Sequence, residues 1–166
     1  PDQQDMQAVQ EHSAAIRALY GKHNLPILGC DNMLVALRNF SFLQDVEFVT
    51  AVRDRATGEG GQNDVDVNKI WRLHTYTWCC RNALAIDGDL VECGIHMGLY
   101  SGVMLALVDL VAAGKKIVMY DTFSGLDERF STSRERRQTE DVYQIENWEQ
   151  SVRNSFTAWP HAEIIM

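Results

Sequence analysis

Apolar residues recur at helical spacing in the first part of the chain. They are Met6, Val9, Ile16 and Leu19. Intervals of three and seven residues place these side chains on one face of a helix, and Gly21 stands where such a helix would end. The pattern therefore predicts one helix over this stretch. The sequence does not indicate which element packs against its apolar face.

The next segment is predicted to contain two shorter helices and a loop. Asp31 is suited to cap the first of these helices, whose apolar positions are Met33, Leu34 and Leu37. The second places Val46, Phe48, Val49 and Val52 on one side. Residues 56–64 (ATGEGGQND) are polar and glycine-rich, which predicts a loop and the best internal boundary. We expect a helical segment over 1–64, for capping or dimerisation, and a second domain over 65–166.

Helices and apolar strands alternate in that second part. The predicted order is a helix from Val67 to Leu84 closed by the Asp87–Gly88 turn, a strand at 89–93, a helix at 101–113, a strand at 117–120, an acidic Arg-rich loop, a helix from about Asn147, and a strand at 162–166. A βαβ order with continuous apolar strands predicts an α/β fold with a parallel sheet covered on both faces.

Composition and charge limit the classes of function. With 166 residues, 46% of them hydrophobic, the chain can bury a sizeable core. Its formal net charge of -8 argues against nucleic acid and anionic membrane surfaces as partners. Neither a membrane-spanning apolar run nor a signal sequence is visible, so a cytoplasmic location is expected.

Cysteines and tryptophans are expected to be structural. The cysteines are Cys30, Cys79, Cys80 and Cys93, and the tryptophans are Trp71, Trp78, Trp148 and Trp159. No cysteine pair has the CxxC spacing of a zinc site or a disulfide framework, so reduced and mostly buried thiols are predicted. The tryptophans are predicted to anchor the core.

Candidate chemistry gathers where the first two predicted parallel strands end. Gly94 and Gly98 follow the first strand, and Ser101 offers a hydroxyl near the start of the next helix. Asp121 ends the second strand, where an acid in doubly wound sheets accepts hydrogen bonds from a ribose. Glu92 lies inside an apolar strand and needs a partner if it is buried.

These residues narrow the choice of ligand without fixing it. Glycine-rich turns also serve close packing, which is the alternative to a ligand site. The dinucleotide pattern GxGxxG is absent because the turn reads CGIHMG, and the phosphate-binding pattern ending in Gly-Lys-Ser/Thr is absent too. S-adenosylmethionine tolerates a looser glycine pattern than NAD or ATP, because it presents an amino-acid end instead of a pyrophosphate.

Two stretches at the predicted site resemble one enzyme family. GDLVECGIHMGLYSG (88–102) and KKIVMYDTFSGLDE (115–128), preceded by IWRLHTYTWCCRNAL (70–84), resemble the macrocin O-methyltransferase family, and the likeness covers about residues 40–166. The resemblance implies a Rossmann-like class I methyltransferase fold that binds S-adenosylmethionine. Glu92, Gly94 and Ser101 would contact the methionine end and Asp121 the ribose. The full set of predicted cofactor-binding residues is Glu92, Cys93, Gly94, Gly98, Ser101, Asp121, Thr122 and Phe123.

The resemblance also implies parts that this chain lacks. Family members continue past the third strand with four more strands, which carry metal-binding aspartates and the catalytic base. We therefore expect a fold truncated after the third strand, with no metal ligands in this chain and Mg²⁺ bound only through residues beyond it. In the expected strand order 3-2-1-4-5 the first strand would be an open edge, covered by a second copy, by the segment LPILGC, or by the rest of a longer protein.

Other candidate residues carry less specific signals. His74 and His96 are the candidates for a base, although single histidines are more often structural. Trp71 or Tyr76 would lie near the methyl acceptor if the family arrangement holds. The RERR run at 134–137 is expected in a solvated loop, with a role as a mobile lid as the alternative.

The sequence thus predicts an S-adenosylmethionine-dependent O-methyltransferase. The expected acceptor is a hydroxyl of a sugar or natural-product-like small molecule, and the expected assembly is a homodimer. A non-catalytic interaction module derived from the same half-fold is the alternative. An NAD-dependent oxidoreductase is a more distant one, because the GxGxxG pattern is missing.

Overall fold

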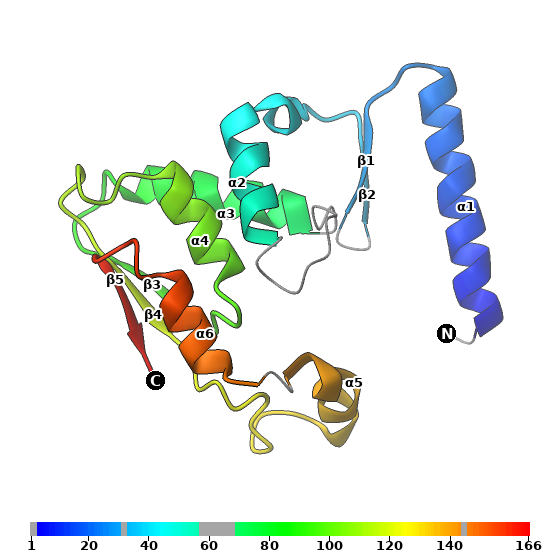
Figure 1. Ribbon diagram of the computed structural model, residues 1–166. Coiled ribbons are helices and arrows are strands. Elements are labelled where there is room, and N and C mark those ends of the chain that lie inside the picture. The colour runs from blue at the N-terminus through cyan, green and yellow to red at the C-terminus, as the bar shows by residue number, and fades with distance from the viewer. Residues whose placement is uncertain (1–2, 31–32, 57–68, 144–145) are drawn as a thin grey trace. The chain divides into compact units, whose positions relative to one another are not determined.

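The computed structural model describes residues 3–30, 33–56, 69–143 and 146–166 (Figure 1). The chain forms two compact units, Pro1–Thr75 and Tyr76–Met166, and the division falls within helix α3 (Ile70–Ala83). The loop at 56–64 and the boundary predicted between residues 64 and 65 fall almost wholly on residues outside the described part, so both stay predictions.

The first unit begins with helix α1 (Gln3–Lys22), which confirms the helix predicted from the apolar spacing. A hairpin of β1 (Ile27–Cys30) and β2 (Met33–Ala36) follows, then the short 3-10 helix η1 (Ser41–Gln44) and α2 (Val46–Ala56). The Asp45 carboxylate accepts a hydrogen bond from the Phe48 N–H at 3.1 Å, which caps α2. Phe48 and Val52 are buried as predicted, whereas Val46 is exposed.

The short helix predicted around Met33, Leu34 and Leu37 is wrong. Met33–Ala36 pairs antiparallel with Ile27–Cys30, in the register Ile27 to Ala36. Two adjacent short apolar runs satisfy one another's backbone groups in this way, which a helix of one turn cannot do. Leu37 has a φ of 57° and donates its N–H to the Pro26 carbonyl at 2.9 Å, so it closes the hairpin. The capping role expected for Asp31 lies outside the described residues.

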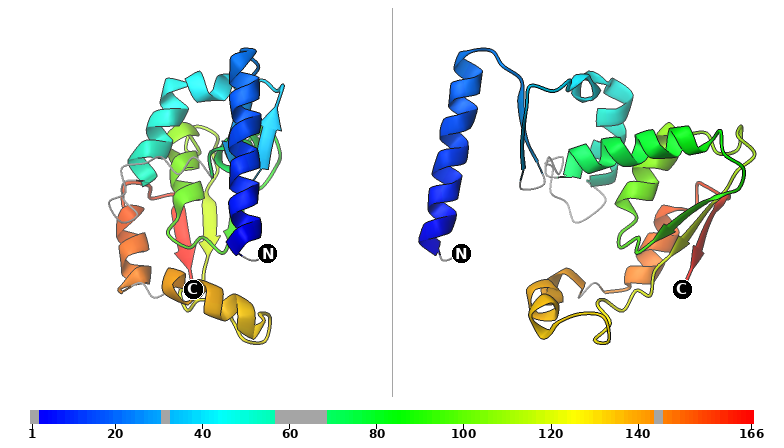
Figure 2. Two further views of the ribbon diagram at one scale, coloured as in Figure 1. Left: turned by 90° about the vertical axis from the view of Figure 1, so that its right-hand side faces the viewer. Right: turned by 180° about the vertical axis from the view of Figure 1, so that it is seen from behind.

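The second unit is an α/β structure around a parallel sheet, as predicted. Its elements after α3 are β3 (Leu90–Cys93), α4 (Leu99–Leu107), β4 (Ile117–Tyr120), α5 (Ser133–Tyr143), α6 (Trp148–Ser155) and β5 (Ala162–Ile165). The strands are parallel in the order β3-β4-β5, with Leu90 beside Ile117 and Ile117 beside Ala162. Figure 2 shows the three strands side by side from two further directions.

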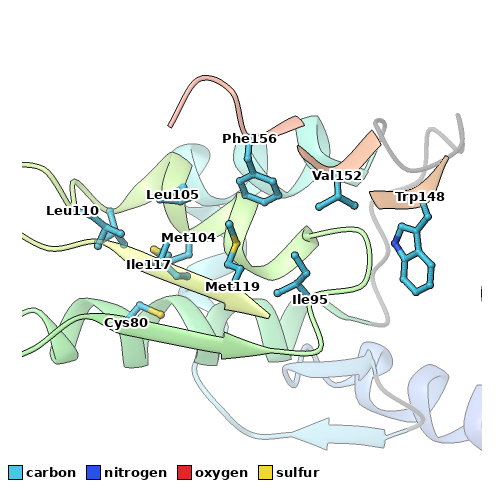
Figure 3. Close-up of a cluster of buried hydrophobic side chains, with 11 residues drawn as sticks. Cys80, Ile95, Met104, Leu105, Leu110, Ile117, Met119, Trp148, Val152 and Phe156 are labelled. Carbon is cyan, nitrogen blue, oxygen red and sulfur yellow. The ribbon is translucent and has the colours of Figure 1, made fainter. Parts of the chain in front are cut away.

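The core of this unit lies between one face of the sheet and helices α4 and α6, with Cys80 of α3 also in the cluster (Figure 3). Met104, Val152 and Phe156 pack there with Ile117 and Met119 of the central strand. Both crossover helices lie on this face, because right-handed connections that step in one direction along a sheet place them on the same side.

The sequence predicted that both faces of the sheet are covered, and the second face differs from this prediction. Strand side chains alternate between faces, and those that point away from α4 and α6 include Val91 and Tyr120. Val91 is 63% exposed and Tyr120 is 40% exposed. The described residues therefore leave this face largely open to solvent.

Helix α4 is shorter than predicted and begins earlier. It runs over Leu99–Leu107, so Ser101 lies within its first turn and is fully buried, while Val108 has extended backbone that ends the helix. The Asp109 carboxylate accepts a hydrogen bond from the Ala112 N–H at 2.9 Å, which holds a separate turn before Gly114. An aspartate that bonds nearby backbone competes with helix continuation.

The loop predicted around RERR is wrong, because these residues lie in helix α5. A capping box starts the helix: Glu135 accepts a hydrogen bond from the Thr132 N–H at 2.7 Å, and the Glu135 N–H bonds the Thr132 hydroxyl at 3.2 Å. The Thr132 N–H and the Thr132 hydroxyl both donate to the Glu135 carboxylate, which lowers the pKa of Glu135. Local hydrogen bonding thus forms a helix where apolar periodicity is absent.

Two expectations about buried residues also need correction. Cys30 and Cys80 are buried, but Cys79 and Cys93 are exposed. Trp148 is buried at 5% exposure, whereas Trp78 is 59% exposed and anchors no core. Cys79 and Cys80 differ in exposure because they are neighbours on α3, and neighbouring helix positions point about 100° apart.

Candidate ligand site at the ends of the parallel strands

The turn between β3 and α4 adopts an unusual backbone. Gly94, His96 and Gly98 have φ values of 77°, 50° and 75°, all in the left-handed region. Glycine adopts this region without strain, whereas a residue with a side chain needs support from its surroundings. The Gly94 N–H bonds the Tyr120 carbonyl at 2.7 Å, which joins the start of the turn to the end of β4.

Asp121 directly follows β4 and faces this turn. Its Oδ2 accepts a hydrogen bond from the His96 N–H at 2.8 Å, and its Oδ1 accepts one from the Phe123 N–H at 2.8 Å. The expected pairing of the two strands, with the acid turned towards the glycine turn, is therefore confirmed. The role of Asp121 in binding a ribose stays a prediction.

A cavity of about 440 Å³ opens beside Asp121. Its lining residues are Cys93, Gly94, His96, Tyr120, Asp121, Thr122, Gly125, Leu126, Tyr143, Trp148 and Met166. The volume lies within the range of about 300–1,000 Å³ that is typical of small-molecule sites. Four of the predicted cofactor residues thus share one cavity, at the carboxyl ends of the strands where doubly wound sheets bind their ligands.

Part of the lining was not predicted from the sequence. Tyr143 ends α5 and stacks on Trp148 at the start of α6, with ring centroids 5.7 Å apart and planes 29° apart. Gly125 approaches Tyr143 so closely that an added Cβ would lie 3.2 Å from the Tyr143 Cβ. Of these residues, the sequence marked Trp148 alone, as one of the tryptophans predicted to anchor the core.

The other predicted cofactor residues are not among the residues that line this cavity. Gly98 packs against Phe156, and Phe123 packs edge-on against Trp148 with centroids 5.5 Å apart. Glu92 accepts hydrogen bonds from the Tyr76 hydroxyl at 2.7 Å and from the Ser101 hydroxyl. The prediction that Glu92 has a partner is confirmed, whereas contacts of Glu92, Gly98, Ser101 and Phe123 with a cofactor stay predictions.

Burial raises the pKa values of three neighbouring groups, Glu92, Tyr76 and Cys80. Burial raises the pKa of the Glu92 carboxyl, and the hydrogen bonds from Ser101 and Tyr76 offset part of that rise. The pKa of the Tyr76 hydroxyl is raised by burial and by the nearby Glu92 carboxylate. Burial also raises the pKa of the Cys80 thiol to about 11.

The free energy of unfolding should depend on pH through Glu92. The folded protein holds this proton more tightly than the unfolded chain, so stability falls as pH rises from the unfolded pKa of about 4.3 to the raised folded pKa, and then levels off. Glu92→Gln should abolish this fall while keeping an acceptor for Tyr76. Urea unfolding over a pH series measures it, with Glu128→Gln, which removes an exposed carboxylate, as the reference. A wild-type curve parallel to that of Glu92→Gln would contradict the prediction.

The two candidate bases lie in different places. His96 lines the cavity, and its ring packs edge-on against Tyr143 and Trp148 at 5.6 and 5.2 Å between centroids. His74 stacks on Phe42 in the first unit, with centroids 4.2 Å apart and planes 11° apart. Of the two, only His96 is among the residues around this cavity.

The described residues form neither a metal site nor a membrane-spanning helix. Over 3–30, 33–56, 69–143 and 146–166, no group of three or more His, Cys, Asp or Glu side chains is arranged to hold a metal ion. Within the same ranges, no helix is long and apolar enough to cross a membrane.

Comparisons with known proteins give a distant similarity of fold. No protein-family model matches the chain, and no curated protein matches it either. Among solved structures, the O-methyltransferase NovP is similar, with a TM-score of 0.46 and 16% sequence identity. The match covers 76% of this chain and 63% of the NovP chain, so this chain spans less than two thirds of that structure's length.

Proposed function

We propose that this chain carries the cofactor-binding half of an S-adenosylmethionine-dependent O-methyltransferase. The observation that carries the proposal is the Asp121 carboxylate, which lines a cavity of about 440 Å³ and is fixed by backbone N–H groups of two loops. A carboxylate held in this way is ready to accept hydrogen bonds from the two hydroxyls of a ribose.

The charge of the cavity supports an adenosyl amino acid over a dinucleotide. Among its described lining residues there is one carboxylate, Asp121, and no lysine or arginine. A pyrophosphate would meet no lysine or arginine there, whereas a sulfonium cation would be attracted by the carboxylate and by the aromatic faces of Tyr143 and Trp148. This chemistry disfavours NAD as the ligand.

S-adenosylmethionine would supply an activated methyl group for transfer to an oxygen nucleophile. The protein's contribution is to orient the reactants and to exclude water. Asp121 and the glycine turn would hold the adenosyl moiety, and the aromatic wall of Tyr143 and Trp148 would shield it. His96 is the cavity residue suited to take the proton of an acceptor hydroxyl. The acceptor, a hydroxyl of a sugar or natural product, and any Mg²⁺ bound by residues outside this chain are parts of the proposal.

Isothermal titration calorimetry with S-adenosylmethionine, S-adenosylhomocysteine and NAD tests the proposal. We expect binding of the first two ligands and no heat with NAD. Binding of NAD alone would favour the oxidoreductase. The absence of heat with all three would favour the second candidate, a non-catalytic interaction module derived from the same half-fold.

Alkylation of Cys93 should report occupation of the cavity. Cys93 is exposed and lines the cavity, while Cys79 is exposed on α3 and is not a lining residue. At about ten times its Kd, S-adenosylmethionine leaves roughly one tenth of the protein free, so iodoacetamide should modify Cys93 about tenfold more slowly. Cys79 should react at an unchanged rate, and Cys80 should stay slow because its pKa is about 11. Peptide mass spectrometry measures each rate, and equal rates at Cys93 with and without cofactor would contradict the prediction.

A further inference from the structure

Three residues with side chains around the ligand site have left-handed backbone. His96, Phe123 and Asn147 have φ values of 50°, 49° and 53°. Residues other than glycine rarely adopt this region unless surrounding contacts hold them there. His96 and Phe123 donate their N–H groups to Asp121, and Asn147 directly precedes Trp148.

One run of hydrogen bonds connects these positions. The Trp148 indole Nε1 donates to the His96 carbonyl at 3.0 Å, and the His96 N–H donates to Asp121 Oδ2 at 2.8 Å. Both backbone polar groups of His96 are therefore held, one by α6 and one by the end of β4. A residue fixed on both sides has little freedom to turn its N–H away from the carboxylate.

Trp148 is itself firmly placed. It is 5% exposed and belongs to the hydrophobic core of the second unit. Tyr143 stacks on its ring, and Phe123 packs edge-on against it. Figure 3 shows Trp148 at the end of the cluster, beyond Ile95 of the glycine turn. The indole N–H is thus aimed at the turn by packing that does not involve Asp121.

We infer that Trp148 is a positioning residue of the ligand site. Its indole N–H holds His96 in the left-handed conformation, which directs the His96 N–H to Asp121 and fixes the orientation of the carboxylate beside the cavity. The ligand-affinity part of this inference rests on the proposed function, whereas the effect on the turn does not. A core role alone would require the shape of the ring but not its hydrogen-bond donor.

A shape-preserving replacement separates these two roles. β-(3-benzothienyl)alanine at position 148 keeps the bicyclic ring and removes the N–H donor. We expect the His96 amide to exchange with solvent about tenfold faster, because one hydrogen bond worth about a factor of ten no longer orders the turn. Urea unfolding and the exchange of the Met119 amide report the accompanying loss of global stability, which should not exceed the same factor of ten, about 1.4 kcal/mol. Nuclear magnetic resonance measures both exchange rates in the protein without ligand.

The variant with the analogue at position 148 also tests the effect on ligand affinity. S-adenosylmethionine should bind about tenfold more weakly, since the carboxylate must be ordered on binding. The matched control places the same analogue at Trp159, which packs on the core but does not line the cavity. An unchanged exchange rate at His96 would overturn the inference, and so would an equal effect from the Trp159 replacement. A wild-type protein that binds no S-adenosylmethionine would contradict the proposed function. The exchange measurement would still decide the role of Trp148, because it needs no ligand.

Discussion

Asp121→Ala should weaken the binding of S-adenosylmethionine by roughly 100-fold or more. Each hydrogen bond to a charged group contributes about 1.5–3 kcal/mol, and two ribose hydroxyls would lose their acceptor together. The variant also frees the N–H groups of His96 and Phe123, so the turn loses its order. Isothermal titration calorimetry measures the effect.

A conservative variant and a matched control sharpen this prediction. Asp121→Asn keeps one acceptor oxygen and should fall between the wild type and the alanine variant. Asp127→Ala removes a carboxylate that follows β4 in the same loop but pairs with Arg129 at 2.6 Å and does not line the cavity. Its affinity should match that of the wild type. If Asp121→Ala bound S-adenosylmethionine as tightly as Asp127→Ala, Asp121 would have no role in the cofactor site.

Gly98→Ala should lower the free energy of unfolding by about 2–5 kcal/mol, the sum of a left-handed backbone penalty and overpacking. The new Cβ would lie 2.7 Å from Phe156 Cζ and closer still to Cε2. Phe156 is 3% exposed within the core of the second unit, so its ring cannot move aside without disturbing its neighbours. Urea unfolding followed by circular dichroism measures the loss.

Gly114→Ala separates the two causes. Gly114 also has a left-handed φ, of 65°, but no heavy atom lies within 4 Å of an added Cβ. Its variant should therefore lose only about 1–2 kcal/mol. Equal losses at the two positions would show that the Phe156 ring accommodates the methyl group and that only the backbone matters.

Much of the second unit could be predicted from the sequence because its strands are short, apolar and separated by glycine turns. The strand at Ile117–Tyr120 lies where it was expected. The convergence of the glycine turn and Asp121 followed from one rule, since the carboxyl ends of parallel strands meet at one edge of a sheet. That rule needs no knowledge of side-chain packing.

The features that were missed depend on other kinds of interaction. Helix α5 has apolar residues only at its last two positions, Val142 and Tyr143, so its signal lies in the capping pair Thr132 and Glu135 and not in apolar spacing. The hairpin of Met33–Ala36 was missed because a four-residue apolar run fits a strand and a helical turn equally well. The wall of Tyr143 and Trp148 arises from the packing of two helices, which sequence periodicity does not encode.

The central position of β4 decides which part of the site survives a partial opening of the molecule. β4 shares hydrogen bonds with β3 on one side and β5 on the other, whereas in the described chain each outer strand is bonded along one side only. Fluctuations that release an outer strand cost less free energy than release of the middle one. Asp121 directly follows β4, so opening of β3 or β5 leaves this carboxylate in place, and the site can form again when the outer strand pairs with β4.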